Sequence, residues 1–145
     1  HTTTQVYGKF WAGYSISFLG AFLAVIVSAF SFSIPPDMCM LTLILCSLGL
    51  IPISAASIII DLLRPKLSWN NPQEAIKQNA NVIFAMLAGF VILVIYGAIG
   101  YLVIKLTSSL YMVFLIMALV LSAFSALSLK LMNQISKDAY RKIEA

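Results

Sequence analysis

Charged residues are scarce in this chain. Lys and Arg number nine and Asp and Glu five in 145 residues, and together they make up 10% of the sequence, whereas soluble domains carry about 25%. Apolar residues make up 61%. So little charge cannot cover the surface of a soluble fold of this size. We therefore expect lipid to solvate most of the chain, which makes it an integral membrane protein.

Residues that do chemistry are equally scarce. The one His is residue 1, so no zinc set exists. Cys39 and Cys46 would lie about 10.5 Å apart along a helix, too far for a disulfide. Gly8-Lys9 lacks the other residues of a phosphate-binding loop. We expect no metal, no cofactor and no catalytic residue, so that the chain alone is neither an enzyme nor an ATPase.

Four uncharged windows dominate the sequence: residues 10–36, 38–60, 78–104 and 106–129. Each exceeds the roughly 20 residues that cross about 30 Å of hydrocarbon. They predict an all-α bundle of four transmembrane helices in one region covering 1–145, with helices at about 10–34, 38–60, 72–104 and 108–130, of which the third crosses the membrane from about 80. Because the chain begins with His rather than Met, we also expect it to be part of a longer protein.

The basic residues predict the orientation. Three lie in the central segment 61–79 and four in the tail 131–145 or at its edge, whereas the two other connections hold one between them. Cytoplasmic connections are enriched in Lys and Arg, so both termini and the central segment are expected in the cytoplasm of a multi-pass cell-membrane protein. The tail should form an amphipathic cytoplasmic helix that lies on the membrane or against a partner, or a solvated end that anchors the last span. Its apolar face would hold Met132, Ile135, Ala139 and Ile143.

Small residues recur on the predicted helices, and such residues let membrane helices approach closely. Pro52 interrupts the second helix and removes one backbone hydrogen bond, which Ser54 or Ser57 could replace. Packing is the first interpretation of these positions, and a transport path or a gating hinge is the alternative. The helix-packing candidates are Gly13, Ser17, Gly20, Ala24, Pro52, Gly89 and Gly100.

The polar segment from Asp61 to Asn81 is the candidate functional region. Pro65 should stop the second helix, while Asn71 and Pro72 should cap and begin the third. A helix from 72 to 104 would be about 50 Å long, so that about 20 Å would project beyond the hydrocarbon. The projecting face is either a docking surface or part of a well-capped connection, and it carries Glu74, Lys77, Gln78 and Asn81.

This segment resembles one in the C-terminal half of bacterial ABC-2-type permease subunits. In that family an Asp-x-x-x-Pro-Lys-x-x-Trp run, followed by Lys-Gln-Asn and another Asn, precedes a hydrophobic helix. The matching positions are Asp61, Pro65, Lys66, Trp69, Lys77, Gln78, Asn79 and Asn81. The resemblance implies a membrane subunit that pairs with a separate ATP-binding subunit. The segment would contact that subunit, or neighbouring cytoplasmic segments, through Asp61, Arg64, Pro65, Lys66, Trp69, Asn71, Pro72, Glu74, Lys77, Gln78, Asn79 and Asn81.

Three functions are compatible with the sequence. The leading hypothesis is the membrane-spanning permease part of an ATP-binding-cassette transporter, with membrane lipid, the ATP-binding subunit and the remainder of the permease as partners and with no role for nucleic acid. The alternative is a helical membrane scaffold that binds other membrane proteins. A carrier acting alone is disfavoured, because ion-coupled transport needs ionisable groups at membrane depth.

Overall fold

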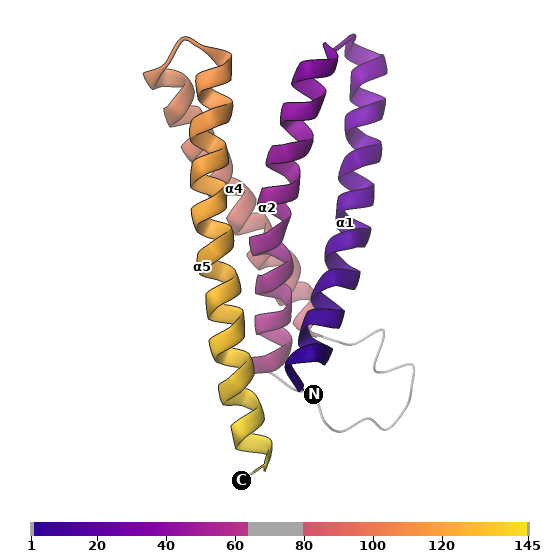
Figure 1. Ribbon diagram of the computed structural model, residues 1–145, viewed down its shortest axis with the longest axis vertical. Helices are drawn as coiled ribbons and strands as arrows, with labels where there is room; N and C mark the ends of the chain where they lie inside the picture. The colour runs from indigo at the N-terminus through magenta and orange to yellow at the C-terminus, as the bar shows by residue number, and fades with distance from the viewer. Residues whose placement is uncertain (1, 64–79, 145) are drawn as a thin grey trace.

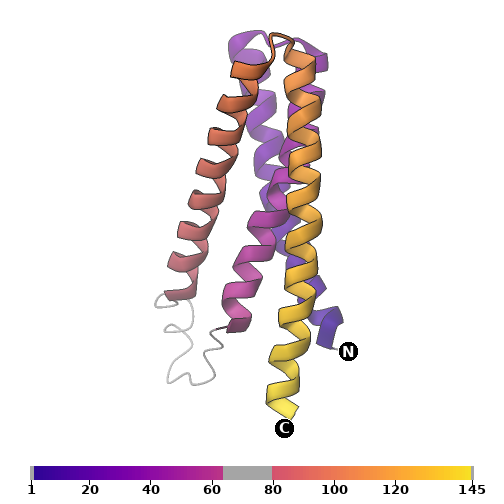
Figure 2. The ribbon, with the colours of Figure 1, turned by 90° about the vertical axis from the view of Figure 1, so that its left-hand side faces the viewer.

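Four long helices run alternately up and down in the computed structural model (Figures 1 and 2). The structure describes the backbone of residues 2–63 and 80–144 and the side chains of 4–63 and 80–139. The helices are α1 (Thr2–Phe32), α2 (Pro36–Leu63), α4 (Ala80–Leu106) and α5 (Leu110–Glu144). The all-α prediction is confirmed for this part of the chain. Both chain ends lie at the lower end of Figure 1, beside the end of α2 and the start of α4.

All four helices are long and apolar enough to cross a membrane. Large apolar side chains on their outer surfaces remain exposed, for example Phe30 at 85% and Leu106 at 85%. In water such a surface would aggregate, whereas in lipid it is solvated. The chain thus has the composition and the surface of a multi-pass helical membrane protein.

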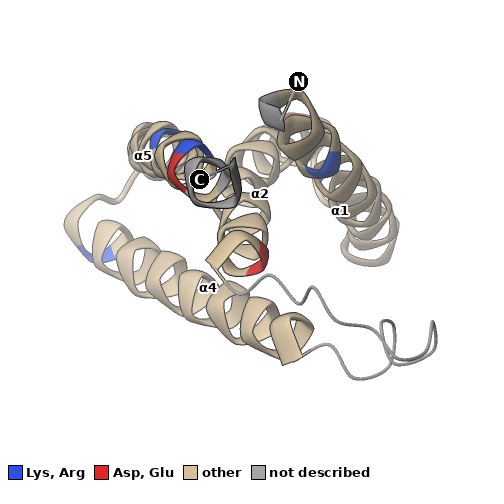
Figure 3. Cartoon of the chain, turned by 90° about the horizontal axis from the view of Figure 1, so that it is seen from below, with Lys and Arg blue, Asp and Glu red and all other residues tan. Residues whose placement is uncertain are grey.

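The helix α2 is the centre of the bundle. Seen from below, α1, α4 and α5 stand around it (Figure 3), and it packs against each of them. The helices α1 and α4 do not touch each other in the described residues. The bundle is therefore open on the side between α1 and α4.

The observed helix bounds extend beyond the predicted ones. The helix α1 begins at Thr2 rather than about residue 10, and α5 runs without a break from Leu110 to Glu144, so that the predicted last span and the predicted tail helix form one helix. The ends of the uncharged windows indicate where the chain leaves the hydrocarbon of the membrane. A helix can continue beyond that boundary until a residue breaks its hydrogen bonds. Residues 131–144 contain neither Gly nor Pro. The predicted start of the third helix at 72 lies outside the described residues.

The upper end of the bundle is closed by two short turns. Ser33 has a φ of 52° and ends α1 in the left-handed conformation, and the N–H of Ile34 bonds the carbonyl of Ala29 at 3.2 Å, as in a Schellman cap. Pro36 then occupies the first position of α2. The hydroxyl of Tyr111, in the first turn of α5, donates to Oδ2 of Asp37 at 2.8 Å. This bond joins the upper ends of α2 and α5.

Candidate functional site

Pro52 lies buried in the middle of α2 and carries no backbone N–H. The carbonyl of Leu48, one turn earlier, therefore has no partner within its own helix. The hydroxyl of Ser125 on α5 supplies one, at 2.8 Å from the Leu48 oxygen, while also lying 2.7 Å from the carbonyl of Leu121. The expectation that Ser54 or Ser57 fills this role is wrong, because Ser57 donates to the Ser54 carbonyl at 2.8 Å instead.

The carbonyls on either side of Leu48 also accept hydrogen bonds from neighbouring helices. Tyr14 of α1 donates to the Ser47 carbonyl at 3.0 Å, and Tyr96 of α4 donates to the Gly49 carbonyl at 3.4 Å. Successive residues of a helix are rotated by about 100° around its axis. Three consecutive carbonyls can therefore serve three different neighbours.

We call these three carbonyls and the hydroxyls of Tyr14, Tyr96 and Ser125 the carbonyl hub. Each outer helix contributes one donor to it. Aromatic neighbours hold the two tyrosine rings: Tyr14 stacks on Phe10 with ring centroids 6.0 Å apart, and Tyr96 meets Phe124 edge-on at 6.2 Å. In a membrane an interhelical hydrogen bond contributes about 0.6 kcal/mol on average and up to about 1.7 kcal/mol. The hub thus joins α1, α4 and α5 to α2 by hydrogen bonds in the middle of the bundle.

The lower half of the bundle holds a second set of contacts. A buried cluster joins α1, α2 and α5 and consists of Val6, Phe10, Ala55, Ile58 and Met132. Beside it the hydroxyl of Tyr7 donates to Oδ1 of Asn133 at 2.9 Å. This lower cluster, as we call these five residues, fixes the beginning of α1 against α5.

Two of the candidate site residues of the polar segment are described, and their side chains meet. Nδ2 of Asn81, at the start of α4, donates to Oδ1 of Asp61, near the end of α2, at 3.2 Å. Both side chains lie at the lower end of the bundle. The other candidates of this segment lie outside the described residues: Arg64, Pro65, Lys66, Trp69, Asn71, Pro72, Glu74, Lys77, Gln78 and Asn79.

The small residues of the sequence prediction fall into two groups. Gly89 of α4 is buried, and a Cβ there would lie 3.4 Å from Cγ2 of Ile53, while Gly100 faces Met117 of α5. These two residues and Pro52 lie where α2, α4 and α5 pack. The stripe on α1 is exposed instead: no described atom comes within 4 Å of a Cβ built at Gly13 or Gly20, and the remaining members, Ser17 and Ala24, are also exposed.

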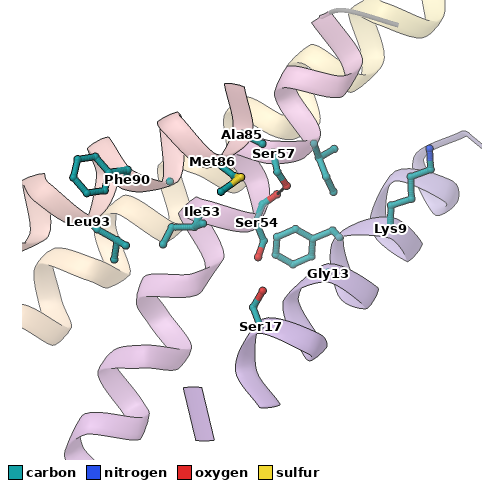
Figure 4. A pocket seen from close by; sticks show the side chains of 13 residues that line it. Lys9, Gly13, Ser17, Ile53, Ser54, Ser57, Ala85, Met86, Phe90 and Leu93 are labelled. Atoms are coloured by element: carbon teal, nitrogen blue, oxygen red, sulfur yellow. Dashed lines mark hydrogen bonds between the residues drawn. The ribbon is translucent and has the colours of Figure 1, made fainter. Parts of the chain in front are cut away.

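A groove of about 550 Å³ lies between α1 and α4, with α2 as its floor (Figure 4). Gly13 and Ser17 of the α1 stripe line one wall, Gly89 and Phe90 of α4 line the other, and Lys9 lies at its lower edge. The volume is within the range of about 300–1,000 Å³ that ligand sites occupy. The groove and the carbonyl hub use different residues of α2.

No group of three His, Cys, Asp or Glu among the described residues could hold a metal ion, and Cys39 and Cys46 are free. Pro52 was a candidate from the sequence, whereas the hydrogen bonds of Tyr14, Tyr96, Ser125 and Asn133 were not predicted from it. The one available signal was the missing N–H of Pro52, which demands a donor for the Leu48 carbonyl.

The fold and the site together define a class of protein. It is a helical membrane protein in which hydroxyls from three neighbouring helices donate hydrogen bonds to backbone carbonyls of a central, proline-containing span. A narrower assignment does not follow from comparison, since no protein-family model, curated protein or solved structure matches the chain.

Proposed function

We propose that the chain is the membrane-spanning permease part of an ATP-binding-cassette transporter. Its polar segment would contact a separate ATP-binding subunit or neighbouring cytoplasmic segments, and ATP hydrolysis would occur in that subunit. The observation that supports this proposal is the hydrogen bond between Asp61 and Asn81. These are the first and last residues of the motif that resembles ABC-2-type permeases.

The bond fixes both ends of the polar segment to the helices that it connects. Asp61 belongs to the last turn of α2 and Asn81 to the first turn of α4. The same two helices are joined again at mid-height by Tyr96 and the Gly49 carbonyl. A force applied to the segment would therefore reach α2 and α4 together, as coupling to an ATPase requires.

The charges support a cytoplasmic lower end. Among the described side chains, three of the four basic residues lie toward the lower ends of their helices, namely Lys9, Lys130 and Lys137, and only Lys105 lies at an upper end (Figure 1). This distribution agrees with the enrichment of basic residues on the cytoplasmic side. The tail would then project into the cytoplasm as an amphipathic continuation of α5, with Met132 and Ser136 buried and Lys137 exposed.

The test is co-purification of the full-length protein with its ATPase. Changing Arg64, Lys66 and Glu74 together to Ala should reduce the amount of ATPase recovered and the ATP turnover of the complex. Lys105→Ala, at the opposite end, is the control and should leave both unchanged. Unchanged complex and unchanged turnover in the triple variant would refute the coupling role.

The exposed small-residue stripe on α1 favours a second candidate, a scaffold that binds other membrane proteins. Gly13, Ser17, Gly20 and Ala24 form a face on which another helix could approach closely. A scaffold would retain its partners when ATP is depleted and when the ATPase is absent. A transporter subunit would lose transport in both cases.

A further inference from the structure

The groove between α1 and α4 has a charged edge and an apolar interior. Lys9 is the single charged residue on its lining, is exposed, and forms no ion pair within the described part of the chain. Farther in, the walls are built by side chains such as Phe90 and by Gly13 and Gly89. A ligand that fits this pattern is anionic at one end and apolar along the rest.

A serine hydroxyl faces the interior of the groove. Ser54 is only 9% exposed, and its hydroxyl makes no hydrogen bond with any described residue. It points toward the hydroxyl of Ser17 across the groove (Figure 4). A hydroxyl that faces an apolar groove can donate to an acceptor placed there, so the groove favours a ligand with a hydrogen-bond acceptor at this depth.

The depth of Ser54 follows from the lower cluster. Phe10, which follows Lys9, is buried in the same cluster as Ala55, which follows Ser54. Lys9 can extend its flexible side chain toward the membrane surface. An acceptor bonded to Ser54 would therefore lie slightly deeper in the membrane than an anion bound to Lys9. Phosphate and ester carbonyls have this order in a phospholipid.

The charge on the lining argues against an apolar transmembrane helix as the occupant of the groove. The lining runs along α1 from Lys9 to Ser17, which is about 12 Å. An apolar helix would offer no anion to Lys9 and no acceptor to Ser54. A lipid with an anionic headgroup and an extended acyl chain offers both along this length.

We propose that the groove binds one anionic phospholipid, with the phosphate at Lys9, an ester carbonyl at Ser54 and an acyl chain between Gly13 and Gly89. Basic pockets between transmembrane helices bind anionic headgroups in the same way. The proposal does not depend on the transport function, because it uses only the described groove.

Native mass spectrometry of the purified full chain, titrated with phosphatidylglycerol or phosphatidylcholine, tests the charge. We expect one tightly held phosphatidylglycerol and weaker binding of phosphatidylcholine. Lys9→Gln should weaken phosphatidylglycerol binding about fivefold, which corresponds to about 1 kcal/mol, and leave phosphatidylcholine binding unchanged. The matched control is Lys130→Gln, which removes a lysine from the same end of the bundle but outside the groove. Equal effects of the two variants would overturn the proposal.

A second pair of variants tests the groove itself. Gly13→Leu places a side chain in the open groove, and Gly20→Leu places the same side chain on α1 beyond it; neither new Cβ meets another described atom within 4 Å. Gly13→Leu should reduce the binding of both lipids, and Gly20→Leu should not. Equal lipid binding by these variants, or a second copy of the chain bound in place of lipid and lost in Gly13→Leu, would refute the lipid site.

Discussion

The helices α1 and α2 are similar in length and hydropathy but differ in environment. The apolar part of α1 has none of its residues buried, while 28% of the corresponding part of α2 is buried. A soluble bundle would place its most apolar helix inside. Lipid chains are as apolar as Leu, so hydropathy does not distinguish inside from outside here. What distinguishes α2 is that its backbone carbonyls accept hydrogen bonds from three neighbours.

The largest effect is expected in the lower cluster, where α1 does become buried. Met132 is fully buried there, and Met132→Ala should lower the free energy of unfolding by about 3 kcal/mol through the cavity it leaves. Met112→Ala, at a site that is 50% exposed, should change it by about 0.5 kcal/mol or less. Unfolding in mixed detergent micelles, followed by circular dichroism, measures both. Equal losses would mean that the cluster contributes no specific packing.

The second largest effect on the free energy of unfolding is expected from a change in the carbonyl hub. Ser125→Ala leaves the Leu48 carbonyl without a donor and should lower the free energy of unfolding by about 1–2 kcal/mol. In a Pro52→Ala background the backbone N–H of residue 52 can bond that carbonyl, so there the same change should cost less than about 0.5 kcal/mol.

The control for this cycle is Ser122→Ala, because the Ser122 hydroxyl bonds only the Ala118 carbonyl of its own helix at 2.7 Å. We expect it to change the free energy of unfolding by less than about 0.5 kcal/mol in both backgrounds. A cost of Ser125→Ala that does not depend on residue 52 would contradict the role assigned to the hub.

A smaller effect compares the two tyrosines of the hub. The Tyr14 bond is 3.0 Å long and the Tyr96 bond 3.4 Å, and hydrogen bonds weaken with length. Tyr14→Phe should therefore cost about 1 kcal/mol and Tyr96→Phe about 0.5 kcal/mol in the same unfolding assay. Tyr101→Phe, at an exposed site, is the control with no expected change. The reverse order of the two hub variants would show that bond length is not the deciding factor.

The smallest effect is expected on the outer face of α1. Gly20→Leu should shift the free energy of unfolding by no more than about 0.5 kcal/mol, because the new side chain meets only lipid. A loss above about 1 kcal/mol, measured in the same micelles, would mean that this face packs against a second copy of the chain.

The sequence predicted the number of helices well, because spanning a membrane depends on the length and hydropathy of a local window. It did not predict which helix is central, since Leu and Ile are equally stable against lipid and against protein. Pro52 correctly located the middle of the hub. Its partners Tyr14, Tyr96 and Ser125 lie 38, 44 and 73 positions away from it along the chain, and only the packing of the helices brings them together.

The contact between the two ends of the candidate polar segment was beyond the sequence for a related reason. That Asp61 and Asn81 should belong to one motif was visible in the sequence, but their direct contact requires α2 to end beside the start of α4. The predicted helix bounds were placed at charged residues, which indicate the membrane surface. For this reason the last span was expected to end near Lys130 and a tail helix to follow it, and in the structure the two form one continuous helix to Glu144.

The unbroken α5 has the proportions of a lever. From Ser125 at the hub to Glu144 it extends 19 residues without interruption, about 28 Å. A swing of about 10° around Ser125 would carry its lower end sideways by about 5 Å, by the same helix geometry, and the beginning of α1 would move with it through the lower cluster and the bond between Tyr7 and Asn133. A small movement of α5 at the Ser125 hydrogen bond would thus produce a larger movement at the lower end of the helix, where another molecule could bind.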